Sequence, residues 1–206
     1  QMAERGITAP TIRNGFGTDP PAGDRQSTRD LLGLSPDELL LVHPVRAIPR
    51  KAVGRAVAIA EELGATYWLL GPAEDGYGPE LARELAAARC PVIHAPLSDR
   101  DDLYAAADVV AFPSTWEGFG NPPVEASLAL RPVVVGSYPV VQELRDLGFS
   151  WFDADDLGPL RTWLESPPDH RQALLTADRA VAVRELSLDR MADRLESLLS
   201  TAGWLP

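Results

Sequence analysis

Short apolar runs alternate with segments of helical periodicity along most of the chain. The runs are rich in valine, leucine and isoleucine, and they predict strands over residues 38–45, 66–70, 91–95, 108–112, 132–135 and 149–152. Before and between them, apolar residues recur every three or four positions, which predicts helices over residues 24–32, 52–63, 79–88, 99–107, 122–130 and 140–147. Ser98 is the predicted N-cap of the helix that begins at residue 99. Residues 157–199 form a helical tail that Pro167 and Pro168 interrupt.

The apolar runs are continuous, without a regular alternation of apolar and polar residues. Continuous runs are typical of strands that are buried on both faces of a sheet. Strands that alternate with helices of this length form right-handed β–α–β units. The sequence therefore predicts an α/β fold, a Rossmann-like doubly wound parallel sheet of about six strands, with helices at its C-terminal end.

Composition narrows the class of protein. The chain has 206 residues, with 19 Lys and Arg against 30 Asp and Glu, so its net charge is −11. This acidic balance argues against nucleic acid as a partner, because a phosphate backbone would be repelled. One cysteine excludes a disulfide scaffold and favours a reducing compartment, so we expect a cytoplasmic protein. No apolar run approaches the ~18 residues of a transmembrane segment.

Several common sites are missing from the strand-to-helix loops, where folds of this class bind ligands. The sequence has no phosphate-binding GxxxxGK[ST] loop, no GxGxxG after the first strand and no GxSxG elbow. The three histidines are scattered and the cysteine is single, so we expect no metal site. Asp153 and Asp155 match the DxD motif of metal-dependent transferases, but we predict that they end the last strand and cap the next helix.

One loop, residues 113–125 (PSTWEGFGNPPVE), carries candidate chemistry. Its glycines let backbone N–H groups approach a ligand, and the helix that follows favours an anion at its start. Glu117 and Glu125 could both accept hydrogen bonds from hydroxyl groups, as a sugar or ribose would offer. The alternative is structural: Glu117 would be a surface carboxylate and Glu125 a favourable charge near the helix N-terminus. The residues alone leave both interpretations open.

The same segment resembles a known family. Glu117 and Glu125 fit the E-x7-E signature of glycosyltransferase family 4, whose members are retaining enzymes with the GT-B fold. The surrounding ADVVAFPSTWEGFGNPPVEASLALRPVVV is similar to that family over about thirty residues. The resemblance implies that Glu117 contacts donor-sugar hydroxyls and that Glu125 holds the nucleotide ribose. It also implies donor-binding backbone groups at four loop residues: Gly118, Phe119, Gly120 and Asn121.

A second part of the resemblance follows the first predicted strand. The family carries an Arg and, five residues later, a Lys that together neutralise the donor diphosphate, and HPVRAIPRKAV places Arg46 and Lys51 at that spacing. Lys51 is the only lysine among the 19 basic residues. The alternative is that both are surface charges near a helix start. The resemblance further implies that backbone groups near Leu97 meet the nucleobase.

The likeness covers nearly the whole chain, but it corresponds to the C-terminal half of a GT-B enzyme. It implies an interdomain linker remnant (residues 1–23), a nucleotide-sugar-binding domain (24–165) and terminal helices (166–206) that belong to it or return to a missing N-terminal domain. That missing half would bind the acceptor, which is unknown, and peripheral membrane association through it stays open. The implied donor is a nucleotide sugar, bound without a metal or other cofactor.

The sequence departs from the family pattern in two places. Leu130 and Arg131 stand where a glycine usually precedes the proline of the next strand, and residues 137–143 (SYPVVQE) lack the usual glycines. Two other functions remain as alternatives. One is a GT-B nucleotide-sugar epimerase, and the other is a non-catalytic Rossmann-like module that binds a ligand or a partner. As a fragment of a transferase, the chain alone is expected to be inactive.

Overall fold

The computed structural model of the protein describes residues 5–6, 9–20, 22–97 and 99–204. Its centre is a six-stranded sheet in the order β3-β2-β1-β4-β5-β6, in which every neighbouring pair is parallel. The strands are β1 (Leu40–His43), β2 (Thr66–Leu69), β3 (Val92–His94), β4 (Val109–Phe112), β5 (Val133–Val135) and β6 (Phe152–Asp153). The predicted Rossmann-like doubly wound parallel sheet is thus confirmed.

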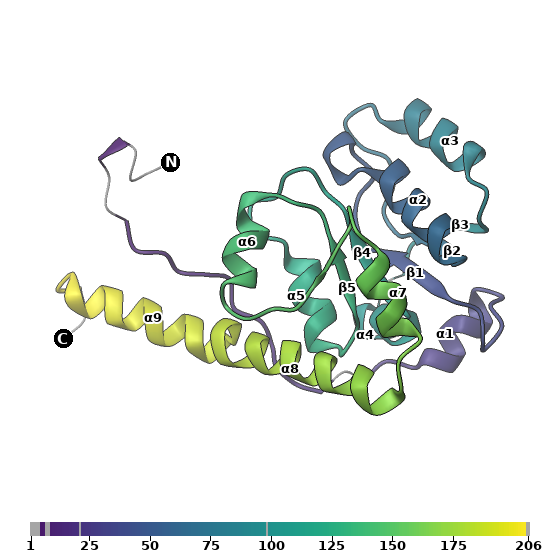
Figure 1. Cartoon of the computed structure of the whole chain (residues 1–206). Helices are drawn as coiled ribbons and strands as arrows, with labels where there is room; N and C mark the ends of the chain where they lie inside the picture. The colour runs from purple at the N-terminus through teal and green to yellow at the C-terminus, as the bar shows by residue number, and fades with distance from the viewer. Residues whose placement is uncertain (1–4, 7–8, 21, 98, 205–206) are drawn as a thin grey trace.

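Helices connect the strands and extend beyond them (Figure 1). They are α1 (Arg25–Leu31), the 3-10 turn η2 (Pro49–Lys51), α2 (Val53–Leu63), α3 (Gly78–Ala87), α4 (Arg100–Ala106), α5 (Asn121–Leu128), α6 (Pro139–Arg145), α7 (Gly158–Leu164), α8 (Pro168–Leu186) and α9 (Leu188–Thr201). Helix α2 packs beside α3, and α1 beside α4. Right-handed crossovers in this strand order put α2 and α3 on one face of the sheet, and α4 and α5 on the other.

The central strands lie inside the molecule, as their continuous apolar runs predict. Every residue of β1, β2, β4 and β5 is buried, whereas the edge strand β3 is partly exposed. Trp68, Tyr67 and Phe112 are the largest aromatic side chains that are completely buried. The rigid centre of the sheet therefore supports the loops that leave β1 and β4 at their carboxyl ends.

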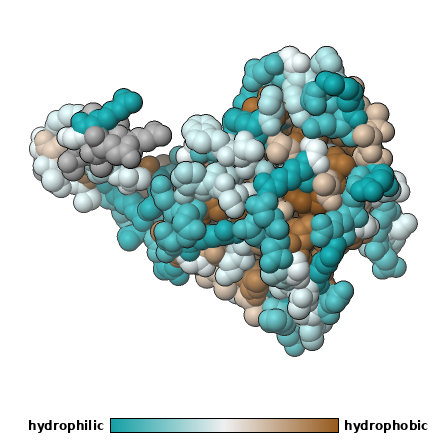
Figure 2. Space-filling model, turned by 45° about the horizontal axis from the view of Figure 1, so that its top comes forward, coloured by the Kyte–Doolittle hydropathy of each residue, from teal (hydrophilic) through white to brown (hydrophobic). Residues whose placement is uncertain are grey.

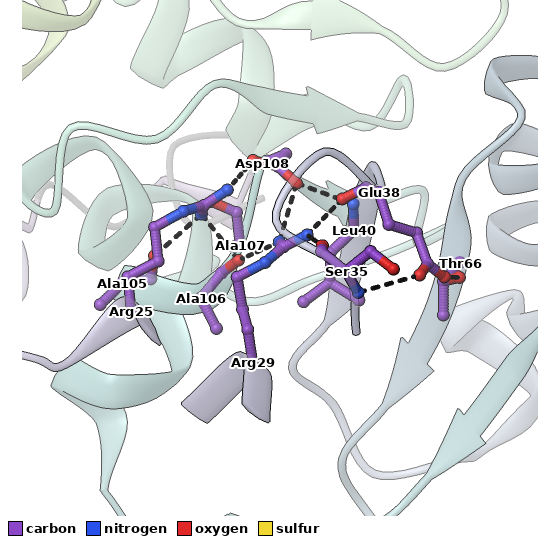
Figure 3. A network of polar contacts seen from close by, with 10 residues as sticks. All are labelled: Arg25, Arg29, Ser35, Glu38, Leu40, Thr66, Ala105, Ala106, Ala107 and Asp108. Atoms are coloured by element: carbon purple, nitrogen blue, oxygen red, sulfur yellow. Dashed lines mark hydrogen bonds and ion pairs between the residues drawn. The ribbon is translucent and has the colours of Figure 1, made fainter. Parts of the chain in front are cut away.

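A network of ion pairs and hydrogen bonds joins α1 to the opposite, amino end of the sheet (Figure 3). The Asp108 carboxylate, just before β4, accepts from Arg25, from Arg29 (3.1 Å) and from the Leu40 N–H (2.8 Å). Arg29 is only 1% exposed, and it also donates to the carbonyl groups of Ser35 (2.8 Å) and Ala106 (3.1 Å). Asp108 therefore neutralises a cation that is almost entirely removed from water.

The last strand is shorter and later than predicted. The apolar pattern predicts a strand over residues 149–152, but β6 comprises only Phe152 and Asp153. The preceding residues have other partners: the Trp151 indole donates to the Ser127 hydroxyl (2.8 Å), and the Ser150 N–H donates to Asp178 (2.8 Å). These bonds fix the segment to α5 and α8, so it does not join the sheet.

The helical tail breaks at the predicted place and at a second one. Pro167 is the N-cap of α8, which confirms the interruption at the two prolines. A further break at Ser187 separates α8 from α9. There the backbone of Phe16 accepts from Leu188 (3.0 Å) and donates to Leu186 (2.8 Å). This contact comes from 170 residues away, so local periodicity gave no sign of it.

Three predicted helix boundaries need correction, one of them the end of α6, which lies at Arg145 and not at the predicted residue 147. The N-cap of α4 is Asp99, whose carboxylate accepts from the backbone N–H groups of Asp101 and Asp102. Ser98, the predicted cap, lies outside the described residues. Helix α5 ends at Leu128, earlier than the predicted residue 130, because Leu130 adopts a left-handed conformation with φ of 56°.

Helix α9 stands out from the body of the protein, and the N-terminal segment runs beside it (Figure 1). Figure 2 shows hydrophilic side chains over most of the face in view, with hydrophobic ones gathered in its hollowed middle. Within the described part of the chain, no helix combines the length and the apolar character needed to cross a membrane.

Candidate functional site

The loop after β1 is held in place by the chain that follows β2. The Ala47 N–H donates to the Pro72 carbonyl (2.9 Å), and the Gly71 N–H donates to the Val45 carbonyl (2.9 Å). A Cβ atom on Gly71 would lie 2.3 Å from that carbonyl oxygen, so only glycine permits the approach. Arg46 extends from this braced loop. Its guanidinium pairs with Glu74 (2.6 Å), and 61% of its side chain is exposed.

Lys51, at the end of the same loop, is not a surface charge. Only 11% of its side chain is exposed, and its Nζ lies 2.6 Å from Glu117 Oε1 and 4.4 Å from the centre of the Phe112 ring. Burial lowers the pKa of the Lys51 ammonium, and the hydrogen bond to Glu117 opposes that shift. Of the two residues that could have been mere surface charges, Arg46 is largely exposed and Lys51 is buried.

Glu117 is bound by two cations. Only 8% of its side chain is exposed, so it is not the surface carboxylate of the structural alternative. Besides Lys51, its second oxygen accepts from Arg50 Nη1 (2.7 Å). The same guanidinium donates to the Trp116 carbonyl (3.1 Å) and lies 5.8 Å from the centre of the Trp116 ring. The loops after β1 and β4 are therefore joined through the carboxylate of Glu117.

Arg50 is the residue of this group that the sequence analysis missed. Its carbonyl also accepts from the Thr115 N–H (2.9 Å), so one residue contacts three consecutive residues of the other loop. The available signal was its position beside Lys51 at the carboxyl end of a buried strand. That signal was weak, because 18 arginines are spread over the whole sequence.

The loop after β4 turns into α5 at a left-handed residue. Gly120 has φ of 96° and precedes Asn121, the first residue of α5. Phe119 stacks on Phe16 of the N-terminal segment, with ring centres 6.2 Å apart. The Asn121 Oδ1 accepts from Asn14 (2.9 Å), and Gly118 has open space around its Cα. The N-terminal segment thus packs on this loop through aromatic and amide contacts.

Glu125 lies one turn into α5 and faces α4. Its two oxygens accept from the Tyr104 hydroxyl (2.8 Å) and from Arg100 Nη1 (2.8 Å). Burial and the neighbouring carboxylate raise the pKa of Tyr104 well above its ordinary value, so this hydroxyl stays a donor. Neither partner of Glu125 was identified from the sequence, because α4 and α5 are brought together only by the fold.

A cleft of about 600 Å³ lies between these elements at the carboxyl ends of the strands. Its charged and hydrogen-bonding lining residues are Arg46, Arg50, Lys51, Arg100, Tyr104, Asn121 and Glu125. Leu70, Leu97 and Leu103 add apolar surface. Five residues predicted from the sequence line this cleft: Arg46, Lys51, Leu97, Asn121 and Glu125.

Four of the predicted site residues do not line the cleft itself. They are Glu117, Gly118, Phe119 and Gly120. Glu117 instead forms ion pairs with two residues that do line it, Arg50 and Lys51. A second cavity of about 420 Å³ adjoins the cleft and shares with it Arg100, Tyr104, Asn121 and Glu125.

The residues that could bind a metal are engaged elsewhere. No three His, Cys, Asp or Glu side chains of the described residues come together as metal ligands. His43 is completely buried with Nδ1 2.8 Å from the Tyr67 hydroxyl, and burial lowers its pKa to about 3. Asp155 pairs with Arg55, and Asp153 ends β6 as predicted. Neither aspartate caps α7, whose N-cap is Leu157.

Comparisons with known proteins bear on the family and the fold of the chain. The model of the family described as "Glycosyl transferases group 1" matches residues 46–154. A D-inositol 3-phosphate glycosyltransferase of Mycobacterium sp. (strain KMS) is 37% identical over 131 residues, which cover 57% of this chain and 30% of that protein. The chain thus spans less than a third of the length of this curated relative.

Solved structures share the fold. The Anabaena protein Alr3699/HepE, crystallised with UDP-glucose, superposes on 97% of this chain and 60% of its own, with a TM-score of 0.80 and 24% identity. The C-terminal domain of a glycosyl transferase group 1 family protein (LpcC) from Francisella tularensis covers 84% of this chain and all of its own. Its TM-score is 0.63 and its identity 19%.

Proposed function

The chain belongs to the glycosyl transferases group 1 family, and on that premise we propose that it is the donor-binding half of a retaining glycosyltransferase. The whole enzyme would transfer a sugar from a nucleoside diphosphate sugar to an acceptor held by a second, N-terminal domain outside this sequence. In this proposal residues 1–23 are the linker, 24–165 the donor-binding domain and 166–206 the terminal helices.

The observation that carries the proposal is the arrangement of basic, acidic and apolar residues around the cleft. Arg46, Arg50 and Lys51 lie on the side formed by β1, in a protein whose net charge is −11. Leu97, Glu125 and Arg100, which pairs with Glu125, lie on the side formed by the chain before α4, by α4 and by α5. A nucleoside diphosphate has the complementary pattern: two charged phosphates at one end, and a ribose and an apolar base at the other.

Each residue then has a distinct role. Arg46 and Lys51 bind the diphosphate, and their charge stabilises the negative charge that develops on it as the sugar departs. Glu125 accepts from the ribose hydroxyls, since each of its oxygens keeps a second lone pair beside its present bond. Glu117 would accept from donor-sugar hydroxyls once the sugar replaces part of its pairing with Lys51 and Arg50, because its carboxylate lies outside the lining of the cleft. Because the cations already neutralise the diphosphate, we expect no requirement for a divalent metal.

The backbone N–H groups of Gly118, Phe119, Gly120 and Asn121 would supply the remaining donor contacts. Open space around Gly118 lets a ligand approach the chain there. UDP-glucose, the ligand of the Anabaena protein, makes UDP the first nucleotide to test. The mycobacterial relative acts on an inositol phosphate, but that acceptor concerns the whole enzyme and not this half.

The test is an NMR titration of the 206-residue chain with UDP, GDP and ADP. We expect one nucleotide to bind with a dissociation constant of about 0.1–1 mM, because an open half-cleft leaves the ion pairs partly screened. Lys51→Met and Glu125→Gln should each weaken binding about tenfold or more, the loss of one charge-assisted hydrogen bond. Arg83→Gln, which removes a charge on the distant α3, is the matched control.

Two outcomes would overturn the proposal. The first is the absence of saturable binding for all three nucleotides, which would favour a non-catalytic interaction module. The second is binding that Lys51→Met and Glu125→Gln leave unchanged, which would place the nucleotide elsewhere. The chain alone should not transfer sugar, because in this proposal the N-terminal domain positions the acceptor beside the anomeric carbon. Epimerisation of the free nucleotide sugar would instead support the epimerase alternative.

A further inference from the structure

A separate cavity of about 260 Å³ lies at the amino end of the sheet. Three of its lining residues, Leu39, Asp108 and Pro132, immediately precede β1, β4 and β5. All strands are parallel, so this end is opposite to the donor cleft. Helices α7 and α8 line one side of this half-open cavity with Trp163 and Arg171. No role in the proposed transferase reaction falls to this cavity.

Among the described residues, three side chains that line this cavity each carry a buried hydrogen-bond donor with no partner. These donors are Arg131 Nε, Arg171 Nε and Trp163 Nε1. Trp163 is only 7% exposed. Two other buried indoles do have acceptors: Trp68 donates to the Ala95 carbonyl (2.9 Å) and Trp151 to Ser127 (2.8 Å). A buried donor left unpaired costs about 1–3 kcal/mol, so three around one space call for an acceptor.

The cavity also has an excess of positive charge. Within the described residues, no carboxylate lies within 4.0 Å of the Arg131 or Arg171 guanidinium. Asp108 lines the cavity too, but Arg25 and Arg29 already pair with it. Burial and the nearby charge of Arg25 lower the pKa of Arg131. Both arginines are only half-buried, so water still reaches part of each guanidinium group, but an anion would pair with the two positive charges directly.

Two local features beside the cavity are energetically unfavourable. Leu130 has φ of 56°, a left-handed conformation that costs a non-glycine residue about 1–2 kcal/mol. Arg171 lies in the first turns of α8, where the helix dipole disfavours a cation. Unfavourable features of this kind concentrate at functional sites. Both act here on residues that line the same space.

We propose that this cavity is a binding site for a phosphate group, held by Arg131, Arg171 and the indole N–H of Trp163. Each planar guanidinium presents parallel N–H donors that match two phosphate oxygens. The volume corresponds to several water molecules at ~30 Å³ each, so it admits a phosphate that carries a short organic group. The ligand is inorganic phosphate or a small phosphate monoester. The site is independent of the donor cleft.

The Trp163 indole offers a direct readout. In a 15N NMR spectrum the chain gives indole N–H signals from five tryptophans, and Trp163→Phe identifies the one at the cavity. Titration with inorganic phosphate should move this signal saturably, while those of Trp68 and Trp151, which are bonded elsewhere, should stay in place. Parallel titrations with glycerol phosphate and with acetate, at constant ionic strength set by chloride, distinguish the monoester, phosphate itself and a simple carboxylate.

Two variants decide the assignment. Arg131→Gln and Arg171→Gln should each weaken phosphate binding at least tenfold, whereas Arg83→Gln, which removes an exposed charge from α3, should leave it unchanged. If Arg131→Gln fails to fold, Arg171→Gln on the outer helix carries the test. Acetate that binds as well as phosphate overturns the phosphate assignment. A Trp163 signal that does not move, or that moves equally in all variants, overturns the site.

Discussion

The buried pair of Lys51 and Glu117 gives the sharpest prediction about the structure. Glu117→Gln removes the negative charge but keeps the side-chain shape and one acceptor oxygen. It leaves an ammonium group that is only 11% exposed, beside the guanidinium of Arg50. Breaking a buried pair by removing one partner costs about 3–5 kcal/mol. Because the amide oxygen of glutamine can still accept one hydrogen bond, we expect a loss of stability near the lower end of this range, about 3 kcal/mol.

Lys51→Met should cost less, because Glu117 keeps Arg50 as a partner at 2.7 Å. Methionine also retains a favourable contact with the Phe112 ring. We expect about 1.5 kcal/mol, the lower end for one charge-assisted hydrogen bond. The double variant removes the unpaired ammonium as well, so it should be more stable than the sum of the two losses by about 1–3 kcal/mol.

The same pair predicts a dependence on pH. Glu117 is the group that raises the pKa of Lys51 against burial, so Glu117→Gln lowers that pKa further. Below the unfolded pKa of lysine, the unfolded state of the variant then binds more protons than the folded state, and stability rises with pH. The deficit of Glu117→Gln against the unchanged protein should shrink between pH 7 and pH 10.

Urea unfolding of the single variants and the double variant at several pH values, followed by tryptophan fluorescence, measures both effects. The matched control is Glu165→Gln, which alters an exposed carboxylate at the end of α7. Additive losses within about 0.5 kcal/mol, or a deficit that is constant with pH, would show that the two side chains are not coupled as the structure indicates.

Three further predictions concern stability away from the cleft. Asp108→Asn leaves the buried guanidinium of Arg29 without its carboxylate, so the free energy of unfolding should fall by about 3–5 kcal/mol. The loss should appear as a lower urea midpoint, and an unchanged midpoint would contradict the role given to this network. Leu130→Gly relieves the left-handed strain at φ of 56° and should raise stability by up to about 1 kcal/mol after the entropy cost of glycine, whereas Leu130→Val should lower it. Burial raises the pKa of Asp178 to about 6, so the folded state holds the extra proton between pH 4 and 6, and stability from this group falls as pH rises through that window. Against Asp178→Asn, which can still accept from Ser150, the unchanged protein should lose up to about 3 kcal/mol from pH 4 to 7, and a pH-independent difference would refute the assignment.

The sequence by itself determined the layers of the fold and the loops that hold the candidate site. Continuous apolar runs specify strands buried on both faces, because a strand in the centre of a parallel sheet has no face toward water. The spacing of Glu117 and Glu125, and that of Arg46 and Lys51, can be read directly from the sequence because each pair lies within a short segment. Through the family resemblance these spacings predicted a donor site, and three of the four residues, Arg46, Lys51 and Glu125, line the cleft.

Only the tertiary structure decided which charges meet. Arg50 reaches Glu117 across 67 positions, Tyr104 reaches Glu125 across 21, and Phe16 reaches the break at Ser187 across 171. The cavity that joins Arg131, Trp163 and Arg171 likewise draws on segments that are separate in the sequence. Propensity and periodicity describe neighbours within about one helical turn. Partners brought together by the sheet depend on packing of the whole chain, and that information is not local.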